Sequence, residues 1–226
     1  MKRTVLLLNG SQRQGGGTSA VLGKLLLTYL CAGGFRSERI ELRHAVKTAR
    51  GIAAVCRAVE QAELIVLSFP LYLDTVPYCV TRVFEAVYKA QGTKPAARQG
   101  LVAIVNCGFP EAHHNDVALE VCRRFASASG MRWLGGLAMG GGEALKGRHP
   151  RWFLPLTCPI LQALRRAAVD LAAGRLVSEQ ARRRMARPLL PRRLFYLMAG
   201  FRWYSAAFRS GAHQNLRARC KPSGRA

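Results

Sequence analysis

The feature that most constrains the fold of this chain is a series of short strand-like segments that alternate with helical patterns. Three of the segments are short apolar runs, as is typical of parallel strands buried on both faces, and two contain charged residues. The expected strands cover Thr4–Asn9, Arg36–Leu42, Leu64–Phe69, Leu101–Asn106 and Met131–Met139. Helical spacing of apolar residues predicts helices near residues 18–30, 51–62, 75–87, 111–129 and 157–173. This alternation predicts an open α/β sheet of five parallel strands with right-handed crossovers.

The composition indicates a folded domain of ordinary size with an appendage. Of the 226 residues, 50% are hydrophobic, which supplies a sizeable core and excludes general disorder. The seven cysteines lie mostly in apolar segments and form no CxxC motif, which favours buried thiols in a reducing compartment over disulfides or a cysteine-rich metal site. No apolar run reaches the roughly 18 to 20 residues of a membrane span, so we expect a cytoplasmic protein.

Positive charge is concentrated toward the C-terminus. The formal net charge is +23, and residues 151–226 hold 16 of the 35 Lys and Arg but 2 of the 12 Asp and Glu. We expect a domain over residues 1–175 and a basic extension over residues 176–226, with an amphipathic helix between Pro191 and Gly211. Such a helix suits peripheral contact with an anionic membrane, and no specific nucleic acid is expected. A helix whose arginines are merely solvated is the simpler alternative.

A Gly-rich loop follows the first expected strand, at the edge where open parallel sheets bind ligands. Its sequence is NGSQRQGGGTS, residues 9–19. Hydroxyls, glycine N–H groups and one arginine just before a helix N-terminus form a suitable cradle for a phosphate. The loop lacks the GxxxxGKS or GxxxxGKT pattern and the spacing of a dinucleotide-binding motif. It therefore predicts a monophosphate site, with a flexible capped loop as the alternative.

Two further loops follow the third and fourth expected strands. The segment PLYLDTVP, residues 70–77, has a proline at each end, which stiffens a loop whose backbone groups can meet the edge of a planar heterocycle. The segment NCGFPE, residues 106–111, has a glycine that permits close backbone approach and a phenylalanine that can lie against a ring. A plain connection is the alternative for each loop taken alone.

Together the three loops resemble those of the NAD(P)H-dependent FMN reductase branch of the flavodoxin-like superfamily. The first is similar to that family's GSxRxxxxTS phosphate loop, and the second to its PxYxxxxP isoalloxazine loop. The resemblance covers residues 1–175 and implies a flavodoxin-like three-layer α/β sandwich with strand order 2-1-3-4-5. It implies that the phosphate is held by Ser11, Arg13, Thr18 and Ser19. It implies that the flavin is lined by Pro70, Leu71, Tyr72 and Leu73, and on another edge by Asn106, Gly108 and Phe109.

The resemblance also implies an activity. Members of this family pass a hydride from NAD(P)H to FMN, then electrons to an acceptor. The expected protein is therefore an FMN-containing NAD(P)H oxidoreductase whose small-molecule acceptor is a quinone, nitroaromatic, azo compound or flavin. Because the cofactor supplies the chemistry, no residue is expected to be catalytic. The family suggests a homodimer. A non-enzymatic electron carrier, and a cofactor-poor scaffold that docks through its basic tail, stay open as alternatives.

Several residues near these loops carry separate expectations. Leu73 stands where many relatives have tryptophan, so weaker binding of the flavin is expected. Cys107 is expected to be a small buried thiol, and Glu143 a solvated loop acid. The adjacent His113 and His114 have no third ligand placed beside them, so no metal site is expected.

Overall fold

The computed structural model describes residues 3–14, 17–91, 99–154 and 156–212. The chain divides into two compact units, Met1–Leu189 and Leu190–Ala226. None of the described helices is both long enough and apolar enough to cross a membrane.

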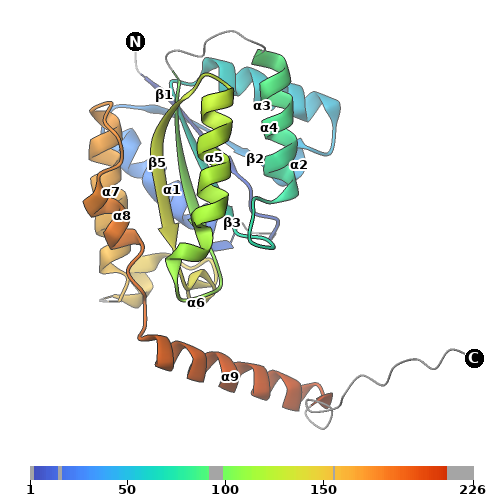
Figure 1. Ribbon diagram of the computed structural model, residues 1–226, viewed down its shortest axis with the longest axis vertical. Helices are drawn as coiled ribbons and strands as arrows, with labels where there is room; N and C mark the ends of the chain where they lie inside the picture. Colours follow the sequence, from blue (N-terminus) through green and yellow to red (C-terminus); the bar gives the residue numbers. More distant parts are fainter. Residues whose placement is uncertain (1–2, 15–16, 92–98, 155, 213–226) are drawn as a thin grey trace, which may run out of the picture. The chain divides into compact units, whose positions relative to one another are not determined.

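The first unit is built on one sheet of five parallel strands in the order β2-β1-β3-β4-β5 (Figure 1). The strands are β1 (Thr4–Asn9), β2 (Arg36–Glu41), β3 (Leu64–Pro70), β4 (Gly100–Asn106) and β5 (Arg132–Met139). The number of strands, their order and their parallel pairing confirm the sequence prediction.

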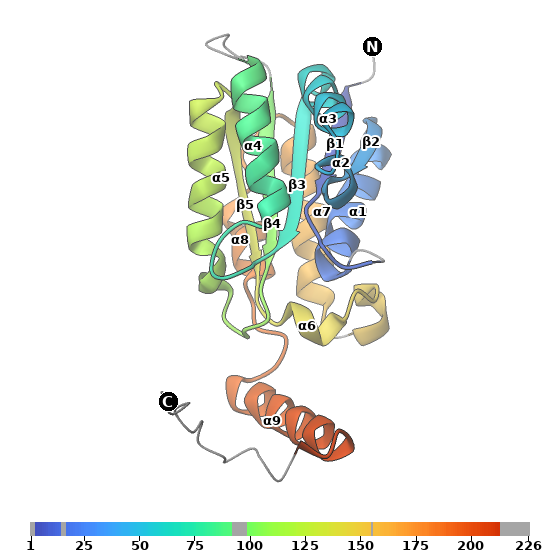
Figure 2. The ribbon, with the colours of Figure 1, turned by 90° about the vertical axis from the view of Figure 1, so that its right-hand side faces the viewer.

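Helices cover both faces of the sheet, which gives three layers (Figures 1 and 2). The helices of this unit are α1 (Gly17–Ala32), α2 (Leu42–Ala45), α3 (Ala49–Gln61), α4 (Tyr78–Gln91), α5 (Asp116–Ala128), α6 (Gly142–Leu145), α7 (Cys158–Ala172) and α8 (Glu179–Met185). Apolar residues of α1, α7 and α8 form one core with the sheet, and those of α3, α4 and α5 form the other.

The two cores follow from the alternation of side chains along each strand. In β1, Val5 and Leu7 belong to the core beneath α1, whereas Leu6 and Leu8 belong to the core beneath α3 and α4. All four side chains are buried. Because successive side chains of a strand point to opposite faces, a continuous apolar run is what a strand between two helical layers requires.

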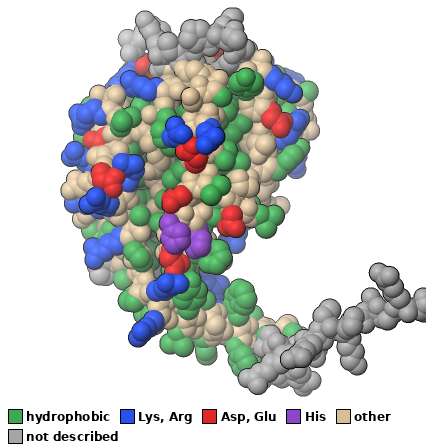
Figure 3. Space-filling view, viewed as in Figure 1, with side chains coloured by type: hydrophobic (Ala, Val, Ile, Leu, Met, Phe, Trp, Pro, Cys, Tyr) green, Lys and Arg blue, Asp and Glu red, His purple; other side chains and the backbone are tan. Residues whose placement is uncertain are grey.

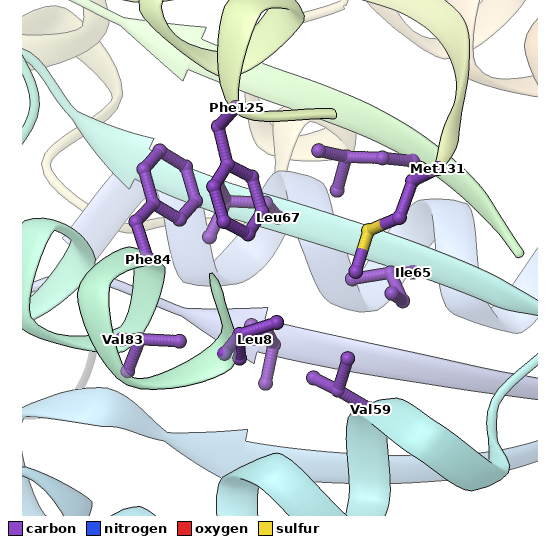
Figure 4. A pocket seen from close by; sticks show the side chains of 10 residues that line it. Leu8, Val59, Ile65, Leu67, Val83, Phe84, Phe125 and Met131 are labelled. Atoms are coloured by element: carbon purple, nitrogen blue, oxygen red, sulfur yellow. The ribbon is translucent and has the colours of Figure 1, made fainter. Parts of the chain in front are cut away.

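The core beneath α3, α4 and α5 is closely packed. Phe84 of α4 and Phe125 of α5 stack with their ring centroids 3.8 Å apart and their planes 6° from parallel (Figure 4). The space between these rings and the strands measures about 10 Å³ and is lined by apolar side chains. A space of that size in an apolar environment is a packing defect rather than a ligand site.

Two helices begin later than the sequence predicts. The helix expected from Thr75 begins at Tyr78, because residues 72–75 form a tight turn whose ends, Tyr72 and Thr75, are hydrogen-bonded to each other. The helix expected over residues 111–129 begins at Asp116, after a 3₁₀ turn over Ala112–Asn115. In both cases the later start of the helix lengthens the loop at the carboxyl edge of the sheet.

The first compact unit extends beyond the expected boundary at residue 175. Val177 donates its backbone N–H to the carbonyl oxygen of Leu134 in β5, at 2.8 Å. Ala181 and Met185 of α8 are fully buried in the core shared with α1 and α7. Residues 176–189 therefore belong with the sheet, and the arginines of α8 lie on the outer side of a helix whose inner side is part of this core.

The link between α7 and α8 is held by a buried carboxylate. Asp170 is 1% exposed and accepts hydrogen bonds from the guanidinium of Arg175 and the backbone N–H of Ser178. Burial raises the pKa of Asp170, and the hydrogen bonds from Ser178 and Arg175 outweigh that effect, so the pKa lies below its usual value. The carboxylate thus stays ionised and fixes the turn that starts α8.

The second unit contains a helix, α9 (Arg192–Arg209). It begins after Pro191 and ends at Arg209, and it is followed by Ser210 and by Gly211, whose φ is +72°. This confirms the helix that the spacing of apolar residues predicts between Pro191 and Gly211. No side chain of α9 is buried.

The extended boundary predicts different roles for two methionines. Met185 is fully buried and Met198 of α9 is 50% exposed. We expect Met185→Ala to lower the free energy of unfolding by roughly 2–4 kcal/mol, because it opens a cavity in the core. Met198→Ala serves as the control and changes it by less than about 0.5 kcal/mol. Urea unfolding followed by circular dichroism measures both, and equal small effects would contradict the assignment of α8 to the core.

Candidate functional site

A cavity of about 190 Å³ lies at the carboxyl edge of the sheet, where the loops after β1, β3 and β4 meet α6. Such an edge is the usual ligand site of open parallel sheets. Its lining residues are Ser11, Arg13, Gly17, Thr18, Ser19, Pro70, Leu71, Tyr72, Asn106, Gly108, Gly142 and Glu143.

The structure brings together all of the site residues expected from the sequence except Leu73 and Phe109, which do not line the cavity. Gly17, Gly142 and Glu143 line it as well and were not expected there. The signal for Gly17 was available, because it lies in the Gly-rich loop itself. Gly142 and Glu143 come from α6, more than a hundred residues away in the chain, and no local pattern marks them.

One end of the cavity is suited to an anion. Helix α1 begins here, and its first turn contains no acidic residue to occupy its N–H groups. Ser11 and Ser19 are each 1% exposed, and the hydroxyl oxygen of Ser19 is buried without a hydrogen-bond partner. A buried hydroxyl without a partner costs free energy, which a bound acceptor recovers. These groups, with Arg13, form a donor set for a phosphate.

Thr18 differs from its neighbours in this loop. Its hydroxyl donates a hydrogen bond to the carbonyl oxygen of Gly142, at 2.7 Å, and accepts one from the backbone N–H of Gly147, at 3.2 Å. The hydroxyl proton is therefore already used to hold the α6 segment against α1. An anion in the cavity would meet the backbone N–H of Thr18 rather than its hydroxyl.

An ion pair joins the two sides of the cavity. The Nη2 atom of Arg13 lies 3.0 Å from the Oε2 atom of Glu143, and both side chains are about half exposed. Glu143, expected to be a solvated loop acid, is partly exposed and also lines the cavity beside Arg13. It places a negative charge beside the group best able to bind a phosphate.

The other end of the cavity is formed by the loops after β3 and β4. The backbone N–H of Leu71 donates to the carbonyl oxygen of Asn106, at 2.8 Å, which holds the two loops together. The side-chain oxygen of Asn106 is buried and has no hydrogen-bond partner. Gly142 packs so closely on this side chain that a Cβ atom there would lie 2.4 Å from the amide nitrogen. The oxygen of Asn106 is therefore a fixed acceptor for a donor in the cavity.

Leu73 occupies the tip of the β3–α4 loop. It is 98% exposed, and both Leu73 and Asp74 have positive φ angles, 45° and 58°. Together with the paired ends Tyr72 and Thr75, these angles define a two-residue turn of the kind that favours Asn and Gly. A leucine in the left-handed region is strained. The side chain is held out from the domain rather than folded over the cavity.

Phe109 and Cys107 of the third loop lie beside the cavity. The ring of Phe109 is 50% exposed and packs on His114, with centroids 4.6 Å apart, and His114 stacks in turn on His113. Burial raises the pKa of the Cys107 thiol, and hydrogen bonds with Asn115 and the backbone of Phe109 offset this effect in part. The thiol is protonated at neutral pH and is a poor nucleophile, in line with its expected structural role.

No protein-family model and no curated protein matches this chain. Among solved structures, the NADH:FMN oxidoreductase EMOB in its apo form has 13% sequence identity over 85% of this chain and 98% of its own, with a TM-score of 0.58. The FMN-dependent NADH-azoreductase from Bacillus anthracis str. Ames Ancestor, in complex with FMN, has 11% identity over 76% of this chain and 98% of its own, with a TM-score of 0.54. The flavodoxin from Streptococcus pneumonia TIGR4 has 10% identity over 76% of this chain and 98% of its own, with a TM-score of 0.52.

These likenesses establish the fold. The protein has the flavodoxin-like α/β fold that its sequence predicts, with five parallel strands in the order 2-1-3-4-5. Enzymes and a flavodoxin share this architecture. A fold that serves several functions does not identify one of them, and the residues of the cavity decide what this protein can bind.

The Thr18 hydroxyl is hydrogen-bonded and the Ser19 hydroxyl is not, which predicts effects of different size when each is removed. We expect Thr18→Val to lower the free energy of unfolding by about 1–3 kcal/mol, because it leaves the carbonyl of Gly142 and the N–H of Gly147 without this partner. Ser19→Ala removes a hydroxyl that has no hydrogen-bond partner, so it should lower the free energy of unfolding by no more than about 0.5 kcal/mol. Urea unfolding measures both, and a larger loss for Ser19→Ala than for Thr18→Val would contradict the two roles.

The positive φ of Leu73 predicts that a residue tolerant of the left-handed region stabilises the protein. We expect Leu73→Asn to raise the free energy of unfolding by about 0.5–1 kcal/mol, because asparagine adopts this conformation at lower cost. Leu176→Asn is the matched control, since Leu176 is also an exposed loop leucine and has no positive φ. Thermal and urea unfolding of the two variants give the comparison, and a loss of stability in Leu73→Asn would show that the turn is not strained.

Proposed function

We propose that this protein is an FMN-dependent NAD(P)H oxidoreductase that passes electrons to a small-molecule acceptor, namely a quinone, nitroaromatic, azo compound or flavin. The observation that carries the proposal is the cavity at the carboxyl ends of β1, β3 and β4. It combines a donor set for a phosphate with two loops that offer backbone groups and the side chain of Tyr72 to a planar ring.

The donor set fits the phosphate of FMN. The N-terminal N–H groups of α1, the side chains of Ser11 and Arg13 and the unpartnered hydroxyl of Ser19 would hold it. At about 190 Å³ the cavity is smaller than the roughly 300–1,000 Å³ of pockets that enclose a drug-sized ligand. The cavity would therefore enclose the phosphate and part of FMN, and the rest of the ring system would lie against Tyr72 and the exposed loop beyond it.

When bound, FMN supplies the redox chemistry by accepting a hydride from the nicotinamide and passing electrons to the acceptor. The protein's part is to bind and orient it. The fixed carbonyl of Asn106's side chain would accept a hydrogen bond from an N–H group of the ligand, and Gly108 leaves space for close approach of a ring. No acid–base residue is assigned, and the protonated thiol of Cys107 takes no part.

The proposal also covers where the enzyme acts, its oligomeric state and its contact with the membrane. We place the enzyme in the cytoplasm, as a homodimer, with its basic C-terminal residues in peripheral contact with an anionic membrane. A non-enzymatic electron carrier of the same fold is the competing function. The excess of basic residues disfavours an electron carrier. Carriers of this type have acidic surfaces that attract basic partners, and this protein has a strong positive charge.

The ion pair between Arg13 and Glu143 sets the expected response of FMN binding to substitution. Arg13→Ala should raise the Kd for FMN about tenfold or more, because a charge-assisted hydrogen bond to the phosphate is lost. Glu143→Gln should lower the Kd about two- to fivefold, because the competing carboxylate becomes neutral. Quenching of flavin fluorescence on titration with protein measures both constants.

Two further variants separate this effect from general damage. The double variant Arg13→Ala with Glu143→Gln should bind FMN more tightly than Arg13→Ala alone, since no unpaired carboxylate then faces the phosphate. Arg57→Ala removes an exposed arginine of α3 and should leave the Kd unchanged. Unaltered FMN binding in Arg13→Ala would remove the phosphate site from the proposal.

Turnover distinguishes the enzyme from its competitors. Oxidation of NADH or NADPH by the FMN-loaded protein, with a quinone or azo dye as acceptor, is expected for the reductase. FMN binding without NAD(P)H oxidation would favour the electron carrier, and the absence of FMN binding would favour the cofactor-poor scaffold.

A further inference from the structure

Helix α9 carries an apolar stripe along one side. Its members are spaced three, four, three and four residues apart, which places them in one line on an α-helix. The stripe consists of Leu194, Leu197, Phe201, Tyr204 and Phe208. Each is exposed, Phe201 by 75% of its surface. From Leu194 to Phe208 the stripe forms an apolar surface about 21 Å long on a helix of 18 residues.

Arginines flank this stripe on both sides. At about 100° per residue, Arg193 lies about 60° from the centre of the stripe on one side, and Arg209 and Arg202 lie about 100° and about 120° from it on the other. Long arginine side chains can lay their methylene stems along an apolar surface and extend the guanidinium away from it. An apolar line bordered by cations is the pattern of a helix that lies within the interface of an anionic membrane.

The side of α9 opposite the stripe carries Phe195 and two aromatic residues with a polar group. Tyr196 and Trp203 lie there, and the guanidinium of Arg192 stands over the ring of Tyr196, 5.8 Å from its centroid. Tyrosine and tryptophan are enriched at the level of lipid headgroups, because each ring is apolar at one end and polar at the other. This side of the helix is therefore suited to the headgroup layer.

The second unit lacks the acidic residues that balance arginines in the first. On the first unit, Glu120 pairs with Arg123 and Arg124 of α5, and Figure 3 shows acidic side chains among the basic ones on this face. The sequence of residues 190–226 contains eight Lys and Arg and neither Asp nor Glu. The surface that complements this charge is one dense in negative groups.

We propose that α9 lies in the plane of an anionic lipid surface, with its apolar stripe inserted among the acyl chains and its flanking arginines bound to lipid phosphates. The proposal defines the contact that the basic C-terminal residues make, and it rests on α9 alone. It does not depend on the cofactor cavity. The protein can therefore bind membranes without binding FMN, or bind FMN without binding membranes.

A second copy of α9 fits these features less well. Spacing of three and four residues also suits a helix pair, but two copies would bring the three arginines that flank each stripe toward those of the other copy, with no acidic residue in either helix. Nucleic acid accounts for the arginines but leaves the leucines and phenylalanines of the stripe exposed to water. A lipid surface satisfies both the stripe and the charge.

The test is flotation of the full-length protein with lipid vesicles. One set is phosphatidylcholine alone and the other contains about one third phosphatidylglycerol. We expect binding to the anionic vesicles. The stripe variant Leu197→Ser with Phe201→Ser should reduce the partition coefficient about tenfold or more, through loss of inserted apolar surface. The charge variant Arg193→Gln with Arg202→Gln should reduce it about tenfold as well.

Matched controls change the same residue types on the first unit. Val117→Ser with Val169→Ser removes two exposed apolar side chains, of α5 and α7, and Arg50→Gln with Arg57→Gln removes two exposed arginines of α3. Both should bind vesicles like the unaltered protein. All substituted side chains are exposed, so folding is preserved, which circular dichroism verifies.

Three outcomes would overturn the proposal. The first is no binding to anionic vesicles. The second is binding that the stripe variant leaves unchanged, which would indicate simple adsorption of charge. The third is a protein dimer, measured by sedimentation equilibrium, that the stripe variant dissociates while vesicle binding is absent. Brominated lipid quenches the fluorescence of tryptophan residues close to the membrane. Larger quenching in the unaltered protein than in Trp203→Phe would support the proposal, because it would place Trp203 at the membrane.

Discussion

β1 lies inside the sheet, hydrogen-bonded to β2 on one side and to β3 on the other, with Leu6, Leu7 and Leu8 buried between two layers of helices. Since β1, β3 and β4 run parallel and in register, their carboxyl ends reach the same edge together. The side-chain oxygen of Asn9 accepts a hydrogen bond from the backbone N–H of Ser11, and this bond sets the direction of the first loop. The cavity is thus a consequence of parallel pairing, and no single side chain creates it.

The parts of the structure that depend on local pattern were predictable from the sequence. The run from Leu64 predicts β3 to within one residue of its observed end at Pro70, because a strand buried on both faces must be apolar throughout. The residues of the three loops were predictable as cavity residues for the same reason, since each follows a recognisable strand. Leu73 and Phe109 are exceptions, because the direction of a loop tip depends on backbone angles that composition does not reveal.

The parts that depend on distant contacts were not predictable. Thr18 is joined to Gly142 and Gly147, and Arg13 to Glu143, across separations of 124, 129 and 130 residues. Nothing in the phosphate loop alone indicates that one hydroxyl is used for structure or that a carboxylate reaches the arginine. Helix α8 was hidden for a different reason. It buries Ala181 and Met185 in seven residues otherwise rich in arginine, too few apolar positions to give a periodic signal.

The two edges of the sheet are protected in different ways. β2 presents alternating charges, Arg36, Glu38, Arg39 and Glu41, which disfavour pairing with a strand of another molecule. β5 carries one charged residue, Arg132 at its start, and beyond it the chain after α7 returns to the strand through the N–H of Val177. That short return occupies a hydrogen-bonding position that another polypeptide could otherwise use. The residues after α7 therefore protect solubility as well as stability, and a chain shortened before Val177 would present an open strand edge on which copies of the protein can aggregate.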